Sequence, residues 1–147
     1  MSGKFSKRER AVEIVNKLFV HTDNSNWQKL KEEVFAESVH FDMSSLSGEP
    51  AETLTSAEIC EMWEAGFEEL DAVNHLAGNH LVTLNDDDSA GVHVYATATH
   101  YKESAQNGTT RDFVGSYELG LTEVNGAFQI NSFIFHLKFL RGNLDLS

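Results

Sequence analysis

The hydrophobic periodicity of the chain changes near residue 72, and this change restricts the possible folds more than any other feature. Before residue 72, apolar residues recur at helical spacing, about every three to four positions. After it, apolar and polar residues alternate over long runs, which is typical of β-strands. Helices followed by a block of strands indicate an α+β domain with a mainly antiparallel sheet.

Three helices are predicted in the first half. Residues 6–9 and 55–58 each read as a capping box, in which a serine or threonine precedes the helix and a glutamate follows three residues later. A shorter helix is predicted after Ser25. A short strand is predicted at residues 39–44, followed by a loop at residues 46–52.

The second half predicts an antiparallel meander of long strands. Asn125-Gly126, which joins the last two strands, is a strong signal for a two-residue hairpin turn and pairs Val124 with Ala127. The four strands are predicted at residues 72–84, 90–103, 111–124 and 127–140.

Counting outward from this turn predicts which residues share a face of the last hairpin. Asp112 then lies opposite Phe139, and Ser116 lies opposite Phe135. Both faces are largely apolar, so the helices cover one of them and a second subunit is expected on the other. The sequence therefore predicts a homodimer formed through the outer sheet face. The residues expected in this interface are Tyr117, Leu119, Ile134 and His136.

Length and charge exclude several classes of protein. The 147 residues suit a single domain, predicted over residues 1–147. The net charge of −12 disfavours nucleic acid and anionic membranes as partners. The chain has one cysteine, Cys60, no apolar run long enough for a membrane span, and no apolar core of a signal peptide near its beginning. A cytoplasmic protein is expected.

Two histidines in the segment "DAVNHLAGNH", residues 71–80, are the first candidates for chemistry. Period-two alternation places His75 and His80 on opposite faces of one strand, with His75 among apolar neighbours. Asp112 is a carboxylate in a similarly apolar setting. Acid–base chemistry is one interpretation; a structural His–Asp pair, or two solvated residues at strand ends, is the other. None of the histidines has the spacing of a zinc site, so no metal is predicted.

Several scattered motifs together resemble the SnoaL-like domain of the nuclear transport factor two-like superfamily. The motifs are "NW" at 26–27, "VHFDMSSLSG" at 39–48, "NHLAGNHLV" at 74–82, "GSYELGL" at 115–121, "NGAFQI" at 125–130 and "RGN" at 141–143. This resemblance implies a cone-shaped α+β barrel. Scytalone dehydratase, bile-acid dehydratase, ketosteroid isomerase and certain polyketide cyclases are relatives.

The resemblance also implies a site. The dehydratase branch places catalytic groups at positions that match His75, Asp112 and Asp23, and it requires no cofactor. Where that branch has two tyrosines, this chain has Thr22 and Met43. The residues expected to line the ligand pocket are Met43, Ile59, Trp63, Ser116 and Phe135.

Two functions remain open at this point. In the first, His75 is the general base of a dehydratase, isomerase or cyclase that acts on a small, mostly apolar carbonyl compound, with Asp112 and Asp23 in support. In the second, the chain is a non-catalytic module that binds a small apolar ligand. The tyrosines missing at Thr22 and Met43 favour the second, and the set of one histidine and two carboxylates favours the first.

Overall fold

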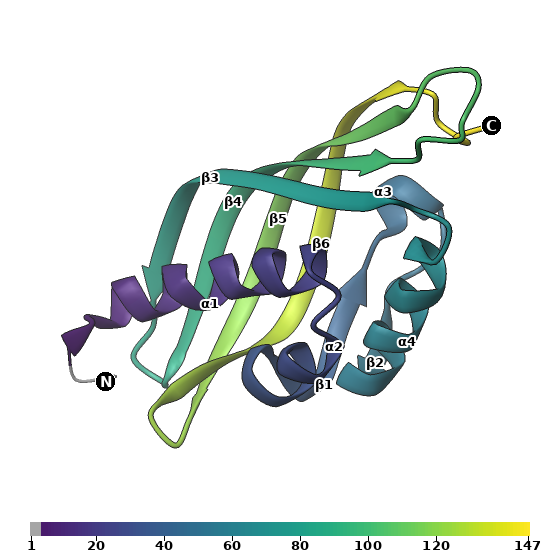
Figure 1. The fold of residues 1–147 in the computed structure, drawn as a ribbon. Helices are drawn as coiled ribbons and strands as arrows, with labels where there is room; N and C mark the ends of the chain where they lie inside the picture. The colour runs from purple at the N-terminus through teal and green to yellow at the C-terminus, as the bar shows by residue number, and fades with distance from the viewer. Residues whose placement is uncertain (1–3) are drawn as a thin grey trace.

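A curved six-stranded sheet forms the body of the molecule, and the computed structural model describes residues 4–147 of the chain. Residues 1–3, which the predicted domain includes, lie outside the described residues. The strands are β1 (Phe35–Asp42), β2 (Glu52–Thr55), β3 (Ala72–Leu84), β4 (Ser89–Tyr101), β5 (Thr110–Val124) and β6 (Ala127–Gly142). Figure 1 shows the sheet curving around the first helix, α1 (Lys7–Asp23).

The strands follow the order β2-β1-β6-β5-β4-β3. Neighbours are antiparallel except β1 and β6, which run parallel. The edge strands β2 and β3 do not pair with each other, so the sheet is curved but not closed. The predicted α+β fold with a mainly antiparallel sheet is confirmed. The expected loop at residues 46–52 is partly structured, because the end of α3 (Ser44–Ser47) and the first residue of β2 lie within it.

The helices cover the concave face of the sheet. α1 and α4 (Ser56–Phe67) begin at the two predicted capping boxes, and both boxes are complete. Between them the chain forms α2 (Trp27–Lys29) and a π-helix, η2 (Leu30–Val34). The apolar faces of these helices and of the sheet meet in one core, in which Leu18, Ile59 and Leu119 are almost fully buried. No helix within residues 4–147 is long and apolar enough to cross a membrane.

The last hairpin has the predicted turn but a different register farther out. Val124 pairs with Ala127 as expected. The register then shifts between Gly120 and Leu121, and again between Val114 and Gly115. A β-carbon at Gly115 would collide with the carbonyl oxygen of a β6 residue, so this close approach requires glycine.

These shifts change which residues of β6 face the core. A one-residue slip moves every following side chain to the other face. Phe133 and Phe135 therefore point inward, whereas Ile134 and His136 point outward. Because the sequence count took no account of bulges, the predicted pairing of Ser116 with Phe135 is wrong, and Ser116 pairs with His136.

A third irregularity lies in β3, between Gly78 and Leu81. Asn79 adopts a left-handed conformation there, with φ of 61°. Asparagine tolerates this conformation better than most residues. The irregularity changes the alternation of faces between His75 and His80.

Candidate active site

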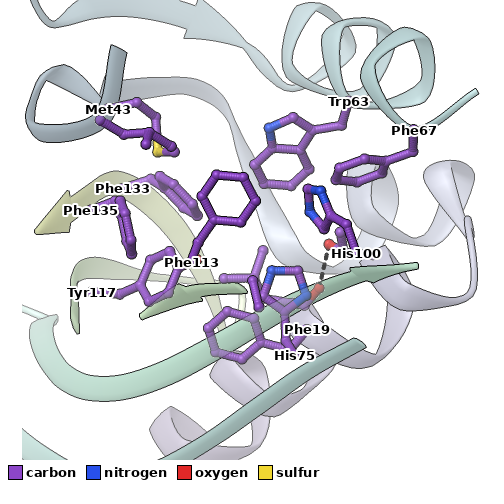
Figure 2. Close-up of a pocket in the computed structure, with 14 residues that line it drawn as sticks. Phe19, Met43, Trp63, Phe67, His75, His100, Phe113, Tyr117, Phe133 and Phe135 are labelled. Carbon is purple, nitrogen blue, oxygen red and sulfur yellow. Dashed lines mark hydrogen bonds between the residues drawn. The ribbon is translucent and has the colours of Figure 1, made fainter. Parts of the chain in front are cut away.

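An apolar cavity of about 210 Å³ lies between the concave face of the sheet, α1 and α4. Figure 2 shows aromatic rings around most of it, with the imidazoles of His75 and His100 pointing inward from β3 and β4. An apolar cavity of about 150 Å³ holds a benzene ring. The size therefore suits a compound of one or two rings. The lining residues are Leu18, Phe19, Thr22, Met43, Leu46, Trp63, Phe67, His75, Ala98, His100, Phe113, Tyr117, Phe133 and Phe135.

His75 forms a close pair with Asp23, the last residue of α1. The Nδ1–H of His75 donates to Asp23 Oδ1 over 2.6 Å, and the backbone N–H of His75 donates to Asp23 Oδ2 over 2.8 Å. An ionised carboxylate only accepts, so this contact places the proton on Nδ1 and leaves Nε2 free to accept. The His75 side chain is 10% exposed, and its ring stacks on Phe19 at 5.2 Å.

His100 is the second imidazole of the cavity. Register pairs His75 with Ala98, so His100 is the diagonal neighbour of His75 on the same face of the sheet. Arg111 Nε donates to His100 Nδ1 over 3.1 Å. Burial lowers the pKa of His100 to about 4, and the charge of Arg111 and the proximity of His75 act in the same direction. His100 is therefore neutral at pH 7.

Tyr117 contributes a hydroxyl to the same cavity. Its ring packs edge-on against Phe19 at 5.2 Å. Burial raises the pKa of the Tyr117 phenol well above its ordinary value, and the charge of Asp23 raises it further. The phenol thus keeps its proton at neutral pH and is a hydrogen-bond donor.

Asp112 does not lie beside His75, contrary to the prediction. Its carboxylate accepts hydrogen bonds from Thr99 Oγ1 and from Arg141 Nε, each over 2.6 Å. These two bonds lower the pKa of Asp112. Phe113 lines the cavity, and its neighbour Asp112 points to the opposite, outer face of β5. The sequence offered no register between residues 72–84 and 111–124, and so did not show that the two residues lie on different faces.

His80 lies on the same side of the sheet as His75, because of the irregularity in β3. Its Nε2 lies 3.2 Å from Oδ1 of Asn16 in α1. The prediction that period two separates the two histidines is wrong for this reason. His80 does not line the cavity, whereas His75 does.

Three of the five predicted pocket residues line the cavity, and the other two do not. Met43, Trp63 and Phe135 line the cavity. Ile59 is completely buried in the core behind it. Ser116 is buried, but it lies on the outer side of β5 between Tyr95 and His136.

Sequence reasoning missed His100 as a site residue, although the signal was present. Strict alternation in β4 places Val92, Val94, Ala96, Ala98 and His100 on one face. A single histidine at the end of an apolar face is a candidate pocket residue. Arg111, which contacts it, carried no comparable signal, because only the cross-strand register brings the two side chains together.

The arrangement offers one proton acceptor and two donors at an apolar cavity. Nε2 of His75 accepts, and the Tyr117 hydroxyl and Nε2–H of His100 donate. Within residues 4–147 there is no cluster of three or more histidine, cysteine or acidic side chains suited to a metal ion. Cys60 is buried, and burial raises the pKa of its thiol, so it is a poor nucleophile.

Solved structures share this architecture. The Kfla4162 protein from Kribbella flavida superposes with a TM-score of 0.88 over 95% of both chains, at 21% identity. A proposed scytalone dehydratase from Novosphingobium aromaticivorans gives 0.80 over 93% of this chain and 87% of its own, at 12% identity. A hexachlorocyclohexane dehydrochlorinase, LinA-type3 from Novosphingobium barchaimii, gives 0.73 over 92% and 89%, at 6% identity. At such identities the likeness shows the fold alone.

Comparison at the level of sequence gives the family. No curated protein matches the chain. The model of the SnoaL-like domain matches residues 4–134, which is most of the chain and includes α1, α4, His75 and His100. The fold, the helical cover over the sheet and this match agree, and the chain belongs to the SnoaL-like domain family.

Proposed function

We propose that the protein is a cofactor-independent acid–base enzyme that acts on a small, mostly apolar carbonyl compound of one or two rings. The observation that carries this proposal is the His75–Asp23 pair at the wall of an aromatic cavity. His75 Nε2 takes a proton from the carbon next to the carbonyl, and Asp23 stabilises the imidazolium that forms. Loss of a leaving group, or return of the proton to another carbon, completes an elimination or an isomerisation.

Two of the structurally similar proteins support this reaction class. One is described as a proposed scytalone dehydratase and another as a hexachlorocyclohexane dehydrochlorinase. Loss of water or of hydrogen chloride removes a proton from one carbon and a leaving group from its neighbour. The proposal for this chain needs the same first step, which is abstraction of a proton from carbon by a positioned base.

The alternative, a binding module without turnover, is favoured by one observation. The Thr22 hydroxyl donates to the carbonyl oxygen of Leu18 over 2.6 Å, and is thus not free to polarise a ligand. Met43, at the other expected tyrosine position, has no hydroxyl. Tyr117 and His100 supply donors elsewhere on the wall, which keeps the enzyme as the better supported function.

Proton exchange into solvent tests the proposal without knowledge of the natural substrate. We expect that one- and two-ring ketones and enones, incubated with the protein in D₂O, exchange the hydrogen next to the carbonyl faster than without protein. NMR of each compound measures the exchange, and quenching of tryptophan fluorescence measures binding, since Trp63 lines the cavity. Binding without exchange would establish the module; compounds that neither bind nor exchange would contradict both functions.

We also propose a homodimer through the outer sheet face, with a corrected set of residues. Tyr117 and Leu119, which were expected in the interface, are buried in the core instead. The outer face carries other apolar side chains, among them Leu76, which is 75% exposed, and Leu81, which is 66% exposed. Such exposed apolar surface is typical of an interaction site.

Charge introduced into this face is expected to abolish the dimer. An aspartate at Leu76 would be buried without a partner in the interface, so Leu76→Asp should give a monomer by light scattering at micromolar concentration. Val20 is 55% exposed on α1, away from the sheet face, and Val20→Asp is the matched control that should remain dimeric. A monomeric wild-type protein would rule out the dimer.

A further inference from the structure

Arg111 is held in place by an unusual set of contacts at the end of the cavity. It stands opposite His100 in the register of β4 and β5. Its Nε–H donates to His100 Nδ1 over 3.1 Å, and its guanidinium carbon lies 5.5 Å from the centre of the Phe113 ring. A guanidinium has only donors, so the His100 atom that it contacts carries no proton. The proton of the neutral ring is therefore on Nε2.

The final residues of the chain hold Arg111 from the other side. Arg111 Nη1 donates to the carbonyl oxygen of Leu144 over 2.9 Å. We call residues 143–147 the C-terminal segment. Its Asn143 contacts the carbonyl oxygens of Thr110 and Gly108, and Leu146 is buried. Figure 1 shows this end of the chain beside the β4–β5 connection.

The β4–β5 connection is tied to the same segment. The carbonyl oxygen of Ser147 accepts hydrogen bonds from the backbone N–H groups of Gln106 and Asn107, at 3.1 and 3.0 Å. The β4–β5 connection and the C-terminal segment are thus joined beside Arg111, which lies at the start of β5. The hydrogen bond from Nη1 to Leu144 and the hydrogen bond from Nε to His100 together orient the guanidinium, with Nε directed at His100.

We propose that Arg111 is a positioning residue that fixes His100 as a neutral imidazole with its proton on Nε2, so that His100 donates a hydrogen bond to the oxygen of the bound ligand. The part of this proposal that concerns the ligand rests on the proposed function. The part that concerns the tautomer does not, because it follows from the contact between Arg111 and His100 alone.

The two histidines then have different tasks. His75, paired with a carboxylate, takes the proton from carbon onto Nε2. The electron pair of that C–H bond forms a carbon–carbon double bond, and the π pair of the carbonyl bond moves onto the carbonyl oxygen. His100 Nε2–H donates a hydrogen bond to this oxygen as its charge grows. No proton passes through His100. The charged groups near His100 agree with this role: Arg111 on β5 and His75 on β3 both disfavour a second proton on His100, and the charge of Asp145 in the C-terminal segment acts on Arg111.

The tautomer is directly measurable. Long-range ¹H–¹⁵N NMR distinguishes a protonated from an unprotonated ring nitrogen, and loss of signals in His100→Asn assigns them. At pH 7 we expect wild-type His100 with the proton on Nε2. Arg111→Met removes the donor while keeping a long side chain, and is expected to give a mixture of tautomers and a higher titration midpoint for His100. Arg111→Lys, which keeps a donor and a charge, is expected to restore the Nε2–H form in part.

Arg141 provides a matched control, because it is an arginine bound to Asp112 on the outer face. Arg141→Met should leave the His100 signals unchanged. A wild-type His100 protonated on Nδ1, or an Arg111→Met protein with an unchanged tautomer and titration, would overturn the proposal, and neither measurement needs a substrate. Where turnover is found, Arg111→Met should lower kcat about tenfold or more with little change in KM. An unchanged kcat beside the expected NMR change would overturn only the ligand-oxygen role.

Discussion

Replacement of His75 by glutamine is expected to lower turnover of a responsive carbonyl compound by about 10²-fold or more. Glutamine retains a hydrogen-bonding group near Asp23 but cannot accept a proton from carbon at neutral pH. The loss should appear in kcat rather than in affinity, since His75 is one polar group in a cavity lined mainly by aromatic rings. Steady-state kinetics and equilibrium binding of the same compound separate the two quantities.

Asp23→Asn is expected to have an effect close to that of the His75 variant. An asparagine can offer an N–H to His75 Nδ1, which favours the tautomer with the proton on Nε2 and removes the free acceptor. It also removes the charge that stabilises the imidazolium. When two groups act as a unit, the losses of activity caused by replacing each of them are not additive. The double variant, with both His75→Gln and Asp23→Asn, should therefore be little less active than either single variant.

Two further variants serve as controls. His80→Ala changes a histidine on the same strand that contacts Asn16 and does not line the cavity. Asp112→Asn changes a carboxylate on the outer face, where it bonds Thr99 and Arg141. Both should keep turnover within a few-fold of wild type. Full activity in His75→Gln would remove the acid–base assignment, and equal losses in all four variants would indicate damage to the fold instead.

The gross architecture was predictable because its signals are local. Capping boxes at residues 6–9 and 55–58 set the starts of α1 and α4, and an Asn-Gly pair set the last turn. Periodicity then separated helices from strands. These features depend on neighbours in sequence, so no knowledge of the tertiary structure was needed.

The site was only partly predictable because it depends on register. One irregular position, Asn79, changes the side of the sheet on which His80 lies, and Gly115 and Gly120 mark similar shifts in the last hairpin. The sequence alone did not reveal these positions. Asp23 was expected near His75 and is there, whereas Asp112 has the same residue type in an apolar setting and lies on the other face. Residue type identified the candidate residues, and only the pairing of β3, β4 and β5 showed which of them lie on the cavity side of the sheet.

The second large expected effect is a loss of folding stability as the pH is lowered from neutral to acidic, and it arises from His100. The pKa of His100 is about 4 in the folded protein, against an ordinary value of 6.5. The unfolded chain therefore takes up this proton first as the pH falls. The stabilisation from a neutral, buried His100 is fully present above pH 6.5, declines as the pH falls toward 4, and does not decline further below it. At about 1.4 kcal/mol per pH unit, the total is on the order of 3 kcal/mol.

A comparison of wild type with His100→Asn separates the contribution of His100 from the contributions of all other titrating groups. Asparagine Oδ1 can accept from Arg111 Nε in place of imidazole Nδ1, but it does not titrate. His21 and His80, whose pKa values are also lowered by burial, and the paired carboxylates remain in both proteins. The free energy of unfolding, from urea titrations at pH 7 and at pH 4.5, should therefore fall by roughly 2–3 kcal/mol more in wild type than in His100→Asn. Parallel losses in the two proteins would show that His100 is not held neutral by the fold, and would remove the basis for treating it as a fixed donor at the cavity wall.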